Sequence, residues 1–154
     1  MCDIATYLKK RRLEIEARLE PLLPQTPACP DTLAEAMRHA VMVGGKRLRP
    51  IICLAAAETV GGSSEDAWPA ALGLELLHSY TLVHDDLPCM DNDLLRRGQP
   101  TVHAKYGEAI AVLTGDALQT LAFETVATTS NQLIAAKLVI ELAQAAGATG
   151  VIGG

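Results

Sequence analysis

The sequence has few aromatic residues and no long alternation of apolar and polar residues. Phe, Trp and Tyr together make up 3% of its 154 residues, although 49% of the chain is hydrophobic. Ala, Leu, Val and Ile must therefore fill the core, and an Ala- and Leu-rich composition without strand patterns favours helices over sheets. We predict an all-α protein that forms a single domain over residues 1–154.

Several other absences narrow the function. The net charge of -5 argues against a nucleic-acid surface, which needs clustered cations. No secretory leader is visible, and no uninterrupted apolar run approaches the ~20 residues of a membrane span. The cysteines are widely spaced, without a Cys-x-x-Cys pair, at Cys2, Cys29, Cys53 and Cys89. We expect no nucleic-acid partner, no membrane span and a reduced, cytoplasmic setting.

Capping residues, glycines and prolines divide the chain into helices. Asp3, one of Ser63 and Ser64, and either Ser130 or Asn131 are placed to cap helices, and Gly44-Gly45 is a stop signal. The predicted helices cover about residues 3–22, 32–43, 50–60, 67–87, 102–106, 108–128 and 131–146. The helix over 108–128 is apolar almost all round, which predicts a central, buried position.

Four aspartates gather at the end of the helix over 67–87, at positions 85, 86, 91 and 93. Carboxylates this close destabilise a fold unless a cation neutralises them, and their hard oxygens suit Mg²⁺ that bridges to a phosphate. A solvent-facing acidic loop is the commoner explanation of an Asp-Asp pair. Asp85 and Asp91 are about 120° apart on an ideal helix, but Pro88 between them predicts a widened helix that brings them together. Arg96 and Arg97 follow and suit either an ion-pair network or a diphosphate clamp.

A second cationic element precedes the helix that Pro50 opens. The segment Gly44-Gly45-Lys46-Arg47-Leu48-Arg49 combines close backbone approach with three cations at a helix N-terminus, although a solvated linker has the same composition. It lacks the spacing of a nucleotide-binding P-loop. His78 lies seven residues before Asp85, on about the same helix face, so we expect both side chains to face one cavity.

Three segments together resemble the trans-isoprenyl diphosphate synthases, most closely the bacterial farnesyl diphosphate synthases. They are GGKRLRP at 44–50, LLHSYTLVHDDLPCMDNDLLRRGQPTVH at 76–103 and GDALQTLAFE at 115–124. The resemblance implies the type I isoprenoid synthase helical bundle and a Mg²⁺-dependent prenyltransferase. Its reaction joins isopentenyl diphosphate to dimethylallyl or geranyl diphosphate, after the allylic diphosphate ionises.

The resemblance also implies residue roles. Asp85 and Asp91 would hold the metal, with Asp86 as a supporting carboxylate, and Arg96 would hold the allylic diphosphate. Isopentenyl diphosphate would bind to Lys46, Arg49, His78 and Arg97. Tyr80 and Thr81 would limit product length; Tyr80 and the two residues Pro88-Cys89 favour farnesyl diphosphate. Geranylgeranyl diphosphate synthases share much of the motif and stay an alternative, as does ordinary core packing for Tyr80.

The sequence departs from that family in length. A second aspartate-rich motif is missing, since only Glu124 and Glu141 follow Asp116. We therefore expect this chain to be the N-terminal half of the enzyme and to be inactive alone. It should expose apolar faces and tend to associate. The family resemblance suggests a homodimer. A terpene cyclase would not need the second basic site. A non-catalytic helical partner of an active synthase is the alternative from another class.

Overall fold

The computed structural model describes residues 3–154 and is almost wholly helical. Its helices and its two short strands, in chain order, are α1 (Ile4–Leu19), a 3₁₀ turn η1 (Glu20–Leu22), α2 (Asp31–Met42), α3 (Leu48–Thr59), α4 (Ser64–Asp85), β1 (Leu95–Arg96), β2 (Gln99–Pro100), α5 (Val102–Tyr106), α6 (Glu108–Ala127), α7 (Gln132–Ala146) and a 3₁₀ turn η2 (Val151–Gly153). The all-α prediction is confirmed.

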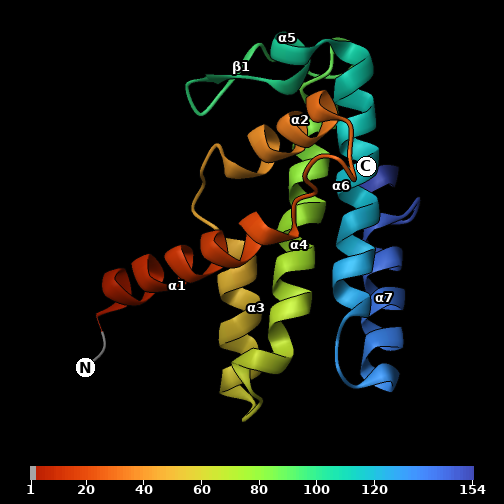
Figure 1. Cartoon of the computed structure of the whole chain (residues 1–154). Coiled ribbons are helices and arrows are strands. Elements are labelled where there is room, and N and C mark those ends of the chain that lie inside the picture. The colour runs from red at the N-terminus through yellow and green to blue at the C-terminus, as the bar shows by residue number, and fades with distance from the viewer. Residues whose placement is uncertain (1–2) are drawn as a thin grey trace.

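Helices α4 and α6 form the centre of the bundle. Figure 1 shows α3, α4, α6 and α7 as neighbouring columns, with α1 and α2 crossing them and the β1–β2 hairpin at one end. Gly73 of α4 permits the close approach, because a Cβ added there would lie 2.4 Å from Cγ2 of Val126 and 3.0 Å from the carbonyl oxygen of Ala122, both on α6. The end of α4 that carries Asp85 is thereby fixed on a rigid pair of helices.

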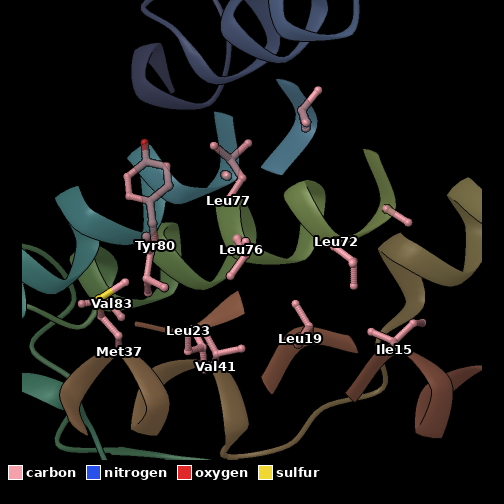
Figure 2. Close-up of a cluster of buried hydrophobic side chains, with 14 of the residues drawn as sticks. Ile15, Leu19, Leu23, Met37, Val41, Leu72, Leu76, Leu77, Tyr80 and Val83 are labelled. Atoms are coloured by element: carbon pink, nitrogen blue, oxygen red, sulfur yellow. The ribbon is translucent and has the colours of Figure 1, made fainter. Parts of the chain in front are cut away.

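Aliphatic side chains fill the core, as the composition predicts. Ile15, Leu19, Leu54, Leu76 and Leu118 are fully buried, and they come from four different helices. Figure 2 shows Leu76 of α4 facing residues of α1 and α2. Burial of each such side chain contributes about 1.5–3 kcal/mol, so the three helices are locked to one another.

The predicted caps are confirmed. The Asp3 carboxylate accepts hydrogen bonds from the amides of Ala5 and Thr6, Ser63 accepts one from Glu65, and Asn131 accepts two from the start of α7. Satisfying these otherwise unpaired amides is what starts each helix at that residue.

Three sequence predictions need correction. Helix α4 ends at Asp85 rather than near residue 87, so Pro88 lies beyond the helix. The loop after the aspartates contains a two-stranded hairpin, which the absence of alternating residues did not predict. Helix α6 is central, but Val112 and Leu113 are 42% and 52% exposed, so one part of its surface has no cover among the described residues.

Apolar surface is also exposed on α7, where Leu133, Ile134 and Ile140 are 79%, 49% and 54% exposed. The segment Gln132–Gly153 is long and apolar enough, by length and composition, to cross a membrane, with a mean hydropathy of 1.3, although Lys137 and Glu141 interrupt its apolar residues. One such segment is weak evidence of a span. The regular helix within it has 15 residues, which cover about 22 Å, against roughly 30 Å of bilayer hydrocarbon.

Candidate functional site: an aspartate loop beside a basic cavity

The aspartate loop folds back on the end of α4. The amide of Asp91 donates to the carbonyl of Asp85 at 2.8 Å, while the amides of Met90 and Asn92 donate to the carbonyl of Leu87 at 2.9 and 3.0 Å. Asn92 has φ 55°, a left-handed conformation that Asn adopts more readily than most residues. The loop therefore brings the backbones of Asp85 and Asp91 together without the widened helix that Pro88 had suggested.

Asp86 faces the interior rather than the loop. It is 3% exposed and accepts hydrogen bonds from the Arg96 guanidinium. Nε of Arg96 lies 2.9 Å from Oδ1 and 3.1 Å from Oδ2, and Nη2 lies 2.6 Å from Oδ1. This bond to Asp86 raises the pKa of Arg96, with burial opposing it. Arg96 also lies 3.7 Å from Asp93. Asp86 thus orients Arg96, whereas Asp85 and Asp91 form no ion pair within residues 3–154.

Asp85 and Asp91 suit a magnesium ion that also binds a substrate phosphate better than one that protein ligands alone enclose. Within residues 3–154, no group of three or more His, Cys, Asp or Glu side chains is placed to hold a metal. Mg²⁺ commonly binds through one or two carboxylates, keeps several waters and completes its shell with substrate phosphate. Asp85 and Asp91 offer such a pair, and the charge of Asp85 also reaches Arg96, whose pKa it helps to raise.

The β1–β2 hairpin presents both arginines of the pair Arg96-Arg97. Arg96 pairs with Gln99, and the connecting residues Arg97 and Gly98 have φ 53° and 78°. Two positive φ values are those of a type I′ turn, whose twist suits a tight hairpin. Consecutive arginines therefore point to different places: Arg96 turns to Asp86, and Arg97 reaches Gly45 of the basic turn.

Side chains from α2 and α5 hold this hairpin in place. The Thr101 hydroxyl donates to the carbonyl of Asp93 at 2.8 Å, and Nε2 of His103 lies 2.9 Å from the same oxygen. His39 Nε2 lies 2.7 Å from the carbonyl oxygen of Pro100. The arginines thus stand on an anchored loop rather than a free one.

A cavity of about 500 Å³ lies between α1, the basic turn, α4 and the hairpin. Its lining is mostly cationic and consists of Arg12, Gly45, Lys46, Arg47, Leu48, Arg49, Glu75, His78 and Arg97. The guanidinium of Arg97 packs on Gly45, where an added Cβ would lie 2.4 Å from Nη1. The structure therefore brings together all four residues for which the sequence suggested an isopentenyl diphosphate site.

Arg47 is the buried anchor of this cavity. It is 3% exposed and donates to Glu75 of α4 at 2.7 Å and to the carbonyl of Val41 at the end of α2 at 2.7 Å. Its Nε lies 3.6 Å from Glu16 of α1. With φ 50°, Arg47 holds a conformation that costs an L-residue about 1–2 kcal/mol, so its contacts must compensate that strain.

Burial and the neighbouring cations lower the pKa values of two groups in the basic cavity. Burial lowers the pKa of His78, and nearby Arg49 adds to the effect, so the neutral imidazole is favoured. Burial, and then Arg47, lowers the pKa of Arg97 from its high ordinary value, which leaves that guanidinium charged. A cavity that disfavours its own positive charges is one that an anion would stabilise.

A second, more apolar cavity of about 400 Å³ lies beside Asp85. Tyr80 and Thr81 line it, and Tyr80, 5% exposed, packs edge-on to His84 with ring centres 5.4 Å apart. Burial and the neighbouring Asp85 raise the pKa of Tyr80. His78 is not in this lining, so the prediction that His78 and Asp85 share one cavity is wrong for the described residues. The two residues lie on about the same face of α4 but seven positions apart, so the two cavities lie at different levels along the helix.

The family model described as polyprenyl synthetase matches residues 30–149, which include the basic turn, α4, the aspartate loop and the hairpin. The chain belongs to the polyprenyl synthetase family. It is 46% identical over 156 residues to geranylgeranyl pyrophosphate synthase 9, chloroplastic, of Arabidopsis thaliana, covering 99% of this chain and 43% of that one. It is also 46% identical over 155 residues to a dimethylallyltranstransferase of Fischerella ambigua (strain UTEX 1903), covering 99% and 44%.

A solved structure of similar fold is the apo FPP/GFPP synthase of Zymomonas mobilis. It matches with a TM-score of 0.91 and 41% identity over 97% of this chain and 55% of that one. The chain is thus a prenyltransferase-family protein with the helical isoprenoid synthase fold. It spans somewhat less than half the length of the curated relatives it matches.

The sequence did not indicate two residues that support the site from behind. Glu75 is a single carboxylate within the apolar run Leu74–Leu77, which was the available signal of a buried ion pair. Arg12, in the basic run Lys9-Lys10-Arg11-Arg12 of α1, also lines the basic cavity. No local pattern connects either residue with the turn at 44–49, because the contacts span three helices.

Proposed function

We propose that this chain carries the substrate-binding half of a Mg²⁺-dependent prenyl diphosphate synthase. The enzyme would join isopentenyl diphosphate to an allylic diphosphate, with geranylgeranyl diphosphate as the product. The observation that carries the proposal is the pair of unlike cavities that α4 helps to line. One is lined by cations, and the other is more apolar, with Asp85 in its lining.

The basic cavity would take the diphosphate of isopentenyl diphosphate. Lys46 and Arg49 flank the start of α3, where helix amides add to the attraction for an anion. His78, held neutral by burial and Arg49, can donate one hydrogen bond without adding charge. Arg97 would close the site from the hairpin. These groups hold the second substrate, so that its double bond reaches the allylic carbon in one orientation.

The aspartate loop would take the allylic diphosphate. Asp85 and Asp91 would hold Mg²⁺, which supplies electrostatic stabilisation of charge on the departing diphosphate. Arg96, oriented by Asp86, would add a guanidinium to the same leaving group. The diphosphate leaves with the electron pair of the C–O bond. The isopentenyl double bond then forms the new C–C bond, and a proton is lost from the product cation.

Product length is the finer part of the proposal. Most of the similar curated proteins are named geranylgeranyl pyrophosphate or diphosphate synthases, which supports a C20 product over the C15 product expected from the sequence. Farnesyl diphosphate stays a second candidate because of one observation: Tyr80 lies on the wall of the apolar cavity, five residues before Asp85. An aromatic ring there shortens the space for a growing chain.

The test is product analysis with labelled isopentenyl diphosphate, Mg²⁺ and dimethylallyl, geranyl or farnesyl diphosphate in turn. The reaction is run on the 154-residue chain and on a form extended with the downstream coding sequence. We expect a C20 product from the extended form, and a longer product when Tyr80→Ala is introduced. A C15 product would refute geranylgeranyl diphosphate as the product and support farnesyl diphosphate. No prenyl product from the extended form, or full activity of Asp85→Asn, would overturn it.

A further inference from the structure

Arg12 on α1 lines the basic cavity, although α1 lies outside the segments that carry the family motifs. It is exposed, and it forms no ion pair with another residue of the described chain. Its neighbour Arg11 differs in both respects: its side chain is 16% exposed, and it is bound to Glu14 and Glu58. Arg12 is therefore a cation available at the cavity.

The orientation of Arg12 is fixed by the helix rather than by chance. Glu16 lies one turn further on, so both side chains project from the same face of α1. The Glu16 carboxylate lies 3.6 Å from Nε of Arg47, the buried anchor of the basic turn. The face that touches Arg47 is thus the face that carries Arg12. Because Glu16 is engaged there, it leaves Arg12 uncompensated.

The charges around the cavity favour a strongly anionic ligand. Glu75 is the one carboxylate in the lining among the described residues, and Arg47 neutralises it. Arg12, Lys46, Arg49 and Arg97 form no ion pair with any residue in 3–154. Four free cations around a cavity of about 500 Å³ exceed what a single phosphate needs and suit a diphosphate.

We propose that Arg12 is a further binding residue for the diphosphate of isopentenyl diphosphate, supplied by α1 opposite Lys46 and Arg49. The proposal rests on the proposed function of the basic cavity and adds to it a cation from the N-terminal helix. Through Arg47, which contacts α1, α2 and α4, the same anchor would place Arg12 and the basic turn at a fixed separation.

The experiment is calorimetric titration of the whole chain with isopentenyl diphosphate in EDTA at low salt. Four forms are compared: wild type, Arg12→Gln, Lys46→Gln and the control Lys10→Gln. Lys10 removes the same charge from the same helix, but its side chain is 74% exposed and lies against Glu14, away from the cavity. Each variant's unfolding midpoint is measured to show that it is folded.

We expect Arg12→Gln to weaken binding about five- to tenfold, since a charge-assisted hydrogen bond is lost at an accessible site. Lys10→Gln should change it less than about twofold. If Arg12→Gln equals Lys10→Gln while Lys46→Gln loses affinity, the role of Arg12 is refuted and the cavity's function stands. If wild type does not bind, or Lys46→Gln binds as wild type does, the function proposed for the cavity fails, and Arg12 with it.

Discussion

The buried pair Arg47–Glu75 gives the sharpest prediction about stability. Glu75→Gln keeps the size of the side chain and one acceptor oxygen, but it leaves the charge of Arg47 inside the protein without its closest partner. Both residues are 3% exposed, and Nη1 of Arg47 lies 2.7 Å from Oε1 of Glu75. Removal of one member of a buried pair costs about 3–5 kcal/mol, since the other charge stays desolvated.

The carboxylate of Glu16, 3.6 Å from Arg47, and the carbonyl of Val41 still face the guanidinium. We therefore expect a loss near the lower end, about 3 kcal/mol in the free energy of unfolding, or roughly 10 °C in the melting temperature. Urea denaturation followed by circular dichroism measures it. The matched control is Glu20→Gln, whose partner Arg38 is exposed, and which should cost less than about 1 kcal/mol.

The double variant Arg47→Met/Glu75→Leu separates charge from packing. Because hydrophobic replacement of a whole buried pair is often neutral, we expect it to recover most of the stability lost by Glu75→Gln. It should not recover affinity for isopentenyl diphosphate, since the basic turn would lose its link to α1. A loss below about 1 kcal/mol for Glu75→Gln would contradict the account of Arg47 as the buried anchor.

Three further predictions concern the helices and the histidine. Gly73→Ala should lower the free energy of unfolding by about 1–2 kcal/mol in urea denaturation, because its Cβ would strike Val126, and Val126→Ala should relieve part of the loss. Asn131→Ala should cost about 1 kcal/mol by loss of the α7 cap; an unchanged denaturation midpoint would refute that. Since the folded state lowers the pKa of His78, its contribution to stability is complete above about pH 6.5 and is lost as the pH falls through the lowered value. His78→Gln should therefore lose less stability than wild type between pH 7 and 5; an equal loss would refute the assignment.

Local features of the fold were predictable from the sequence, because their causes are local. A side chain such as Asp3, Ser63 or Asn131 caps the helix that follows it, so the start of that helix can be inferred within a few residues. The all-α class and the position of α6 at the centre followed in the same way from composition and from the apolar surface of that helix.

The supporting contacts could not be predicted, since they connect distant segments. His39 of α2 and His103 of α5 hold the hairpin that follows the aspartates. A two-residue strand is too short to show a periodicity from which the hairpin could be predicted. Likewise Asp86 was expected to support the metal, whereas the structure turns it inward to Arg96. Adjacent aspartates at a helix end face different directions, and only the packing decides which faces the interior.

The metal dependence of ligand binding tests the central claim most directly, namely that the two cavities lined by α4 are a metal-independent diphosphate site and a metal-dependent one. Isopentenyl diphosphate and geranyl diphosphate are each titrated calorimetrically into the chain, with Mg²⁺ and with EDTA, for wild type and for Asp85→Asn/Asp91→Asn. We predict that isopentenyl diphosphate binds equally well in all four conditions, and that geranyl diphosphate binds only to wild type with Mg²⁺. Isopentenyl diphosphate binding that needs Mg²⁺, or geranyl diphosphate binding that survives the double substitution, would contradict the account.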